Sequence, residues 1–162
     1  MKERQVNFIK AWAEASGSLL DSLPMGSEYL TKGGESKVYL AADGLNVIKV
    51  NDAVYYATWD EYLNSLLLHN LLFPNTLYLL IGFIEIDNIL YAVLQQPFIE
   101  GGQAGMDDIK EFLSYNGFKN TKRQDYYNGD FGLVLEDMHD ENVIAKNDLL
   151  FFIDTVFYVM KK

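Results

Sequence analysis

The stretch that decides the fold is LVLEDMHDENVIAKNDLLFFID, residues 133–154. This region predicts three short strands, because its apolar runs are rich in strand-forming residues. The predicted strands are Phe131–Leu135, Val143–Ala145 and Leu149–Ile153. Lys146-Asn147-Asp148 has the composition of a turn, so the last two strands are expected to form a hairpin. An acidic loop precedes that hairpin, and Asp154 follows it.

Helices and hairpins alternate before this stretch. Apolar residues at helical spacing predict a helix that ends near Leu20 and a second helix from Trp59 to Leu71. Asp43-Gly44 and Asp87-Asn88 are turn pairs, and each lies between two runs typical of strands. Those runs are Val38–Ala41, Leu45–Val50, Leu77–Ile86 and Ile89–Leu94. A short third helix is expected over Asp107–Tyr115.

This order of elements predicts an α+β fold with a mainly antiparallel sheet. Residues 120–130 are polar and predict no regular element. A chain of 162 residues without internal repeats suits one domain, 1–162. The composition indicates a boundary only near Pro97–Gly102.

The charge and composition exclude several classes of function. The net charge is −10, whereas a nucleic-acid surface needs clustered lysine and arginine, so nucleic acid is not an expected partner. The absence of cysteine excludes a disulfide scaffold and a thiol nucleophile. Charges interrupt Met1–Leu20, unlike a signal peptide, and apolar runs such as Ile89–Leu94 are too short to span a bilayer. We therefore expect a cytoplasmic protein without a membrane partner.

Two features of the first half are suited to phosphate. Lys49 lies in the apolar strand 45–50, where a buried ammonium group needs an anion. The alternative is a lysine on an edge strand whose amine reaches water. Gly33 and Gly34 precede Ser36, and adjacent glycines allow backbone N–H groups to approach a phosphate. The alternative there is a plain turn, and neither feature is specific by itself.

Two further features lie in the second half. Asp137 and Asn142 are five residues apart, which is the spacing of the aspartate and asparagine in a kinase catalytic loop. Asp154 ends an apolar strand, and a divalent cation would satisfy its carboxylate. The alternative is an aspartate that caps the next turn.

Taken in order, the glycine turn, the strand lysine, Asp-x-His-x-x-Asn, the hairpin and Ile-Asp resemble the protein-kinase-like superfamily. The pattern is most similar to its aminoglycoside-phosphotransferase-like branch and to the short kinase domains of polyvalent proteins, which phages and conjugative elements carry. The similarity covers roughly Tyr29 to Asp154. It implies an N-terminal helix over 1–24, an antiparallel N-lobe with a helix over 25–96, and a hinge leading into a reduced C-lobe over 97–162.

The resemblance also implies roles for residues that bind ATP. Gly33, Gly34 and Ser36 match the glycine-rich loop over the phosphates, and Lys49 matches the lysine that pairs the α and β phosphates. Gln95–Glu100 matches the hinge that contacts adenine through its backbone.

The resemblance implies catalytic and metal-binding roles as well. Asp137 matches the catalytic base, and Asn142 and Asp154 match the ligands of magnesium. Glu61 is the candidate for the helix glutamate that orients the strand lysine. Thr58-x-x-Glu61 is also a capping box, which is a sufficient structural reason for this glutamate.

The chain departs from the family pattern around the loop. Leu135-Glu136 and Thr155-Val156 replace the usual residues before the base and after the metal aspartate, and only eight residues follow Asp154, where a full kinase has several helices. His139 is expected to bond to the loop backbone rather than to a metal, and His69 is expected to be a packed or half-exposed helix residue.

The expected function is an ATP- and magnesium-dependent phosphotransferase that acts on a hydroxyl of a protein or small molecule. The alternative is a catalytically inactive nucleotide-binding or protein-interaction module of a mobile-element protein. A homodimer or a larger polyprotein is expected to complete what the short C-terminal part leaves open.

Overall fold

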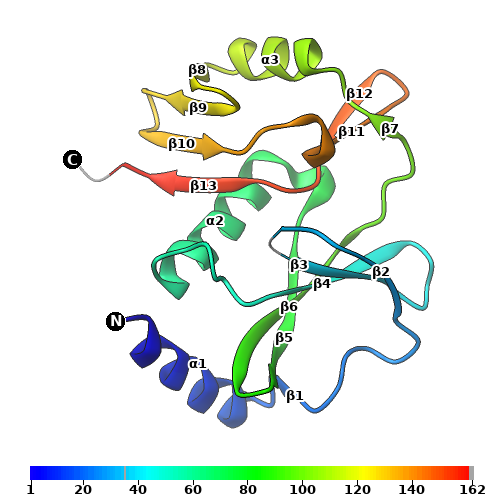
Figure 1. The fold of residues 1–162 in the computed structure, drawn as a ribbon, viewed down its shortest axis with the longest axis vertical. Coiled ribbons are helices and arrows are strands. Elements are labelled where there is room, and N and C mark those ends of the chain that lie inside the picture. Colours follow the sequence, from blue (N-terminus) through cyan, green and yellow to red (C-terminus); the bar gives the residue numbers. More distant parts are fainter. Residues whose placement is uncertain (35, 161–162) are drawn as a thin grey trace. The chain divides into compact units, whose positions relative to one another are not determined.

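The computed structural model describes residues 1–34 and 36–160 (Figure 1). These residues form an α+β structure, as predicted. They divide into two compact units, which are described separately below. The first unit contains Met1–Leu63 and Leu77–Phe98, and the second contains Asn64–Thr76 and the chain from Ile99 onward.

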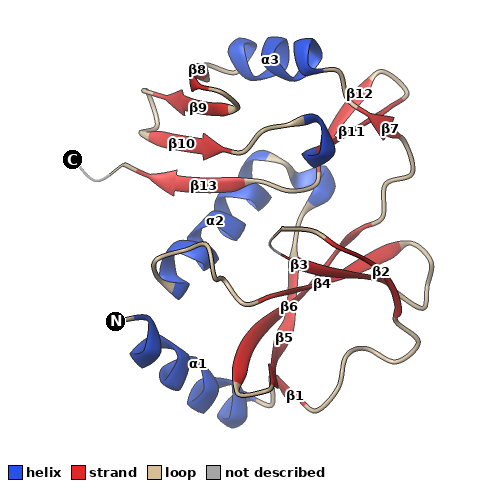
Figure 2. Cartoon of the chain, viewed as in Figure 1, coloured by secondary structure: helices blue, strands red, loops and turns tan. Residues whose placement is uncertain are grey.

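The first unit is built on a six-stranded sheet of order β1-β5-β6-β4-β3-β2 (Figure 2). Its strands are β1 (Leu19–Leu20), β2 (Glu28–Lys32), β3 (Ser36–Leu40), β4 (Asn46–Asn51), β5 (Leu79–Ile86) and β6 (Ile89–Pro97). All neighbours are antiparallel except β1, which pairs parallel to β5, so the sheet is mixed.

Both predicted hairpin turns of this sheet are confirmed. Between β3 and β4, the Asp43 carboxylate accepts hydrogen bonds from the backbone N–H groups of Leu45 and Asn46, at 2.8 and 3.0 Å. Between β5 and β6, Asp87 and Asn88 have φ values of 52° and 63°. Aspartate and asparagine tolerate this left-handed conformation, which the tightest hairpins require.

Helix α1 (Lys2–Ser16) opens the first unit, and Gly17 ends it in a left-handed conformation with φ 72°. The predicted helix end near Leu20 was wrong, because Leu19–Leu20 form β1 and pair with β5. The Gln5 side chain of α1 accepts a hydrogen bond from the Trp59 backbone N–H, at 2.8 Å. Trp59 begins α2 (Trp59–Leu72), and its ring packs edge-on against Phe83 of β5. A side chain of one helix thus satisfies a free N–H group at the start of the next.

The second unit contains α3 (Met106–Tyr115), two short 3-10 helices and two small sheets. The 3-10 helices are η1 (Pro74–Thr76) and η2 (Asp140–Asn142). The four-stranded sheet runs β13 (Val156–Val159), β10 (Leu133–Glu136), β9 (Asp125–Asn128) and β8 (Lys119–Lys122). The three-stranded sheet runs β12 (Leu149–Phe152), β11 (Val143–Lys146) and β7 (Gly102–Gln103). The predicted hairpin of β11 and β12 is confirmed.

The second unit contains two elements that the sequence did not predict. Residues 120–130 were expected to form no regular element, yet they form most of the β8–β9 hairpin, because Tyr126 and Asn128 point into the core at strand spacing. The region after Asp154 also contains a strand, β13, whose Phe157 is 1% exposed and pairs with Leu135 of β10.

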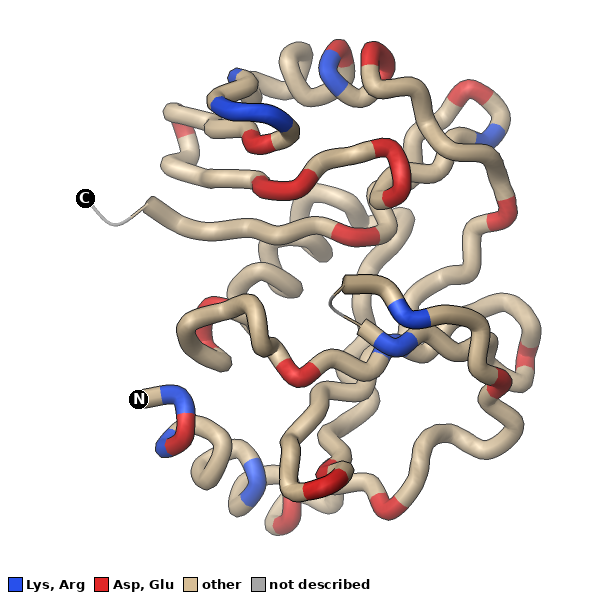
Figure 3. Tube along the Cα trace, in the orientation of Figure 1, with Lys and Arg blue, Asp and Glu red and all other residues tan. Residues whose placement is uncertain are grey.

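The charges of the chain are spread over many elements. Figure 3 shows acidic residues in helices, loops and strand ends, and the basic residues do not gather on one element. Within the described residues, no helix combines the length and the apolar character that crossing a membrane requires.

Candidate active site

Lys49 lies in an interior strand of the first unit's sheet. It is paired with Val38 of β3 on one side and with Leu94 of β6 on the other, and it is only 4% exposed. The alternative of an edge-strand lysine is therefore wrong. Its Nζ lies 5.4 Å from the centre of the Tyr78 ring, a distance at which a cation and an aromatic face attract.

The face of the sheet that carries Lys49 is buried and polar. Asn51 lies two residues along β4, and its Nδ2 donates a hydrogen bond of 3.0 Å to the Ser36 hydroxyl of β3. Gln96 is paired with Val47, two residues before Lys49, and is 1% exposed. The opposite face of β4 carries an apolar core of Ile48 and Val50. The sheet therefore places buried polar groups on one face only.

The glycine turn connects β2 to β3. The Gly33 N–H donates a hydrogen bond of 2.9 Å to the Ser36 carbonyl, and Glu35 lies outside the described residues. A side chain at Gly34 would meet no described atom within 4 Å, and one at Gly33 would meet only the Ser36 carbonyl, at 3.8 Å. Neither glycine has a positive φ. The described structure therefore offers no steric reason for glycine at either position.

Glu61 has the capping role that the sequence predicted. Its backbone N–H donates to the Thr58 hydroxyl, at 3.1 Å. Its carboxylate accepts a hydrogen bond from the Ala57 N–H, also at 3.1 Å. These contacts satisfy backbone groups at the start of α2, and they confirm the capping interpretation.

Asp137 lies in the second unit, directly after β10. It adopts a left-handed backbone conformation with φ 59°, which is uncommon outside glycine and is typical of constrained functional loops. The Asp137 N–H donates to the Asp125 carboxylate at 3.2 Å, and the Asp137 carbonyl accepts from Asn142 Nδ2 at 2.8 Å. The backbone is thus held at both ends, while the side chain remains 64% exposed.

Asn142 is oriented by the same contacts. The carbonyl of Asp137 can only accept a hydrogen bond, so the Asn142 atom facing it is the amide nitrogen. The Oδ1 atom of Asn142 therefore points elsewhere. His139 Nε2 lies 3.3 Å from Asn142 Nδ2 and 3.5 Å from Asp137 Oδ2. The ring of His139 contacts these two side chains, and its backbone makes the hydrogen bonds of the loop.

Asp154 lies beside Asn142. The Asn142 carbonyl accepts hydrogen bonds from the N–H groups of Ile153 and Asp154, at 3.0 and 3.4 Å. The cause is the β11–β12 hairpin, whose pairing of Val143 with Phe152 brings the residues on either side together. An amide oxygen and a carboxylate are ligands that Mg²⁺ accepts, usually together with water and substrate phosphates.

This donor set fits magnesium bound jointly with a nucleotide rather than a cation held by protein alone. The described part of the chain contains no cluster of three or more His, Asp or Glu side chains that would hold a metal ion. The surroundings are nonetheless negative. Burial raises the pKa of Glu136, and the nearby charges of Asp125 and Asp137 raise it further.

A buried network on either side of Asp154 was not predicted. His69 of α2, expected to be packed or half-exposed, is 0% exposed. Its Nδ1 lies 2.7 Å from the Thr155 hydroxyl, and its Nε2 lies 2.9 Å from the Thr76 carbonyl. Because a carbonyl only accepts, Nε2 carries the proton in the neutral ring and Nδ1 accepts from Thr155. The Thr76 hydroxyl in turn donates to the Phe152 carbonyl, at 2.6 Å.

A further hydrogen bond extends this network. The Phe157 N–H donates to the Ser65 hydroxyl at 2.9 Å, and Ser65 lies one helical turn before His69 on α2. The chain around Asp154 is thus held at Phe152, Thr155 and Phe157. The sequence signal for this network was the pair Ser65 and His69, two polar side chains four residues apart in a leucine-rich helix.

The predicted site residues fall into two groups. Gly33, Gly34, Ser36, Lys49 and Glu61 belong to the first unit, whereas Asp137, Asn142 and Asp154 belong to the second. The structure brings the second group together through the loop and hairpin. A shared cleft for Lys49 and Asp154 stays a prediction.

Comparison with known proteins gives one match. A family model described as a serine/threonine/tyrosine kinase found in polyvalent proteins matches residues 2–161. No curated protein matches the chain, and no solved structure does.

Proposed function

Because the chain belongs to the family of serine/threonine/tyrosine kinases found in polyvalent proteins, we propose that it transfers the γ-phosphate of ATP to a hydroxyl group with the help of magnesium. Membership of a kinase family implies the use of a nucleotide. The observation that carries the proposal is the arrangement of Asp137, Asn142 and Asp154, three polar residues that the loop and hairpin hold together.

We assign the phosphates of ATP to the polar side of the six-stranded sheet. Lys49 supplies a positive charge there, on the same sheet face as Ser36 and Asn51. Gly33 and Gly34 allow the backbone to approach the phosphates, which would account for two glycines for which the described residues give no steric reason. Gln95–Glu100 is assigned to adenine. Glu61 is assigned to Lys49 through the family pattern alone.

We assign the chemistry to the acidic loop. Asn142 Oδ1 and the Asp154 carboxylate would hold magnesium, which would supply positive charge against the phosphates. The Asp137 carboxylate takes the proton of the acceptor hydroxyl. The acceptor oxygen then forms a bond to the γ-phosphorus as the bond to the β–γ bridging oxygen breaks, and ADP leaves. The exposed side chain of Asp137 suits contact with an acceptor.

The loop pattern supports a place in the aminoglycoside-phosphotransferase-like branch, and the acceptor is a hydroxyl of a protein or a small molecule. We also propose a homodimer or larger polyprotein as partner. Val159 and Met160, which are 57% and 55% exposed, support an association near the end of the described chain.

A catalytically inactive nucleotide-binding module is the second candidate. It is favoured by Glu136 and Thr155, which replace the residues usual beside the base and the metal aspartate.

Asp137→Asn separates the two candidates. The substitution keeps the shape of the side chain and removes the base, so phosphate transfer should fall by about 10²–10⁴. ATP affinity and melting temperature should remain close to those of the wild type. Transfer of ³²P from ATP to a panel of protein and small-molecule acceptors measures the first, and calorimetry measures the others. Wild-type protein that binds ATP but transfers to no acceptor would favour the inactive module.

A further inference from the structure

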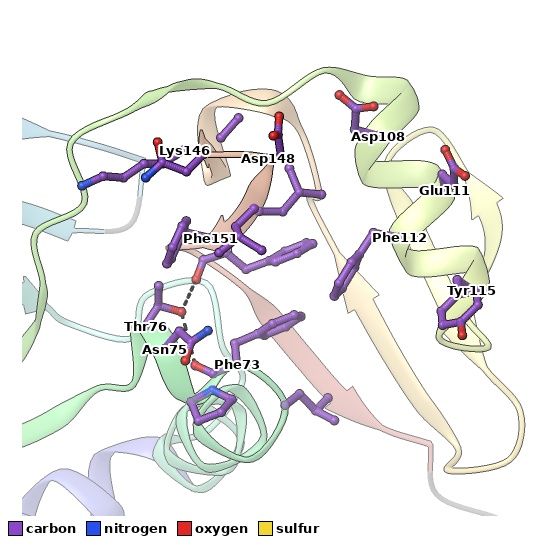
Figure 4. A pocket seen from close by; sticks show the side chains of 17 residues that line it. Phe73, Asn75, Thr76, Asp108, Glu111, Phe112, Tyr115, Lys146, Asp148 and Phe151 are labelled. Atoms are coloured by element: carbon purple, nitrogen blue, oxygen red, sulfur yellow. Dashed lines mark hydrogen bonds between the residues drawn. The ribbon is translucent and has the colours of Figure 1, made fainter.

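The second unit contains a groove away from the acidic loop. The groove lies between α3, the β11–β12 hairpin and the segment from the end of α2 through η1, and its volume is about 890 Å³ (Figure 4). We call it the α3 groove. Asp137, Asn142 and Asp154 do not line it.

One side of the groove is a single face of α3. Asp108, Glu111, Phe112 and Tyr115 follow the spacing of one helical face and line the groove (Figure 4). The adjacent face of α3, which carries Ile109, is buried in the core. Phe112 is 39% exposed and Tyr115 is 91% exposed. Phe112 packs partly against Phe152, whereas the packing of α3 does not explain an aromatic side chain as exposed as Tyr115.

The floor of the groove is aromatic. The Phe73 and Phe152 rings are stacked with their centres 4.3 Å apart, and the Phe112 ring lies 5.1 Å from that of Phe152. Leu149, at the tip of the hairpin, adds a side chain that is 58% exposed. Phe152 itself is 1% exposed, so the apolar surface open to a ligand comes from Phe112, Tyr115 and Leu149.

The rim of the groove is acidic. Its lining contains the carboxylates of Asp108, Glu111 and Asp148 and a single cationic side chain, Lys146. Two of these carboxylates have a structural explanation. Asp108 lies in the first turn of α3, where a negative charge stabilises the helix, and Asp148 occupies a turn position with φ 60°, which aspartate tolerates. Glu111 lies in the middle of α3, so neither the helix N-terminus nor a turn explains its carboxylate. Its carboxylate adds negative charge beside exposed aromatic rings.

We propose that the α3 groove binds a segment of a partner protein in which arginine or lysine alternates with apolar residues. A guanidinium or ammonium group is attracted by carboxylates and by aromatic faces, and its aliphatic stem packs on apolar surface. Apolar side chains of the same segment cover the aromatic floor. The net charge of −10 favours the approach of a basic partner.

This docking surface does not depend on phosphate transfer. If the chain is an active kinase, the segment belongs to the acceptor protein, and loss of docking raises KM without changing kcat. If the chain transfers no phosphate, the groove still binds the segment. Failure of one proposal therefore leaves the other intact.

The test uses a short synthetic peptide that alternates arginine with leucine, and a control peptide with glutamate in place of arginine. The full chain should bind the arginine peptide and not the glutamate peptide, as measured by fluorescence anisotropy. Glu111→Lys should weaken binding roughly tenfold, and Tyr115→Ala roughly thirtyfold, the size of an aromatic hot spot. Both side chains are exposed, so melting temperatures should not change.

Matched controls lie in the first unit. Glu14→Lys makes the same change of net charge on exposed α1, and Tyr55→Ala removes a tyrosine that is 62% exposed. Each should alter affinity by less than about twofold. Equal losses in Glu111→Lys and Glu14→Lys would mean unspecific attraction and would overturn the proposal. Equal binding of both peptides, or no binding of the arginine peptide, would also overturn it. A wild-type dimer that Tyr115→Ala dissociates would overturn it as well, because the occupant of the groove would then be a second copy of the chain.

Discussion

The hydrogen bond between His69 and Thr155 allows a direct test of how Asp154 is held. Thr155→Val replaces the hydroxyl with a methyl group of similar size, so little volume changes at a site that is 7% exposed. The change removes the donor that lies 2.7 Å from His69 Nδ1. Nδ1 is then left buried without that donor, on a ring that is 0% exposed.

The magnitude follows from this burial. Leaving a buried acceptor without its donor costs about 1–3 kcal/mol. The free energy of unfolding should therefore fall by about that amount. Thr155 is also the residue after Asp154, so the carboxylate loses part of its positioning. If Asp154 binds magnesium, as proposed, the loss of such a supporting contact should weaken metal affinity roughly 10–100-fold.

Two measurements separate the structural effect from the functional one. Urea unfolding gives the change in stability, and calorimetric titration of magnesium into protein with ATP gives the change in metal affinity. Thr155→Ser is the matched control, because it keeps the hydroxyl and removes only a buried methyl group, which costs about 0.8 kcal/mol. It should lose some stability but retain the magnesium affinity of the wild type.

Several results would contradict this reasoning. Thr155→Val protein as stable as the wild type would show that the hydrogen bond contributes nothing. Reduced stability with unchanged magnesium affinity would show that the network supports the core without positioning Asp154. Equal magnesium defects in Thr155→Val and Thr155→Ser would point to packing, not to the hydroxyl.

Two further predictions concern other charged residues. Lys49→Met should weaken ATP binding by at least about tenfold, because contacts between charged groups contribute about 1.5–3 kcal/mol. Calorimetric titration of ATP measures this affinity. A folded variant with wild-type affinity would refute the assignment of Lys49 to the phosphates. Burial raises the pKa of Glu136 above its ordinary value of 4.5, and the charges of Asp125 and Asp137 raise it further. The folded state therefore binds the proton of the Glu136 carboxyl more tightly than the unfolded state does. Stability is lost as the pH rises through the raised pKa. Glu136→Gln should therefore raise the melting temperature at neutral pH and flatten its decline from acidic pH, whereas parallel curves would exclude this effect.

Local chemistry was sufficient to predict several parts of this protein from its sequence. The turns at Asp43-Gly44 and Asp87-Asn88, the capping box at Glu61 and the helical spacing of apolar residues in α2 each depend on residues close together in the chain. The hairpin that brings Asn142 to Asp154 is also local, because a two-residue turn, Asn147-Asp148, closes it. For these features the responsible interactions are encoded within a few residues of one another.

Tertiary structure decided the features that depend on distant partners. The polar segment of β8 and β9 became a hairpin through pairing of β9 with β10, and the buried position of Lys49 follows from strands on both sides of β4. His69 and Thr155 are 86 residues apart, so no spacing rule connects them. A buried polar group must find its partner wherever the chain places one, and only the folded structure shows which partner it found.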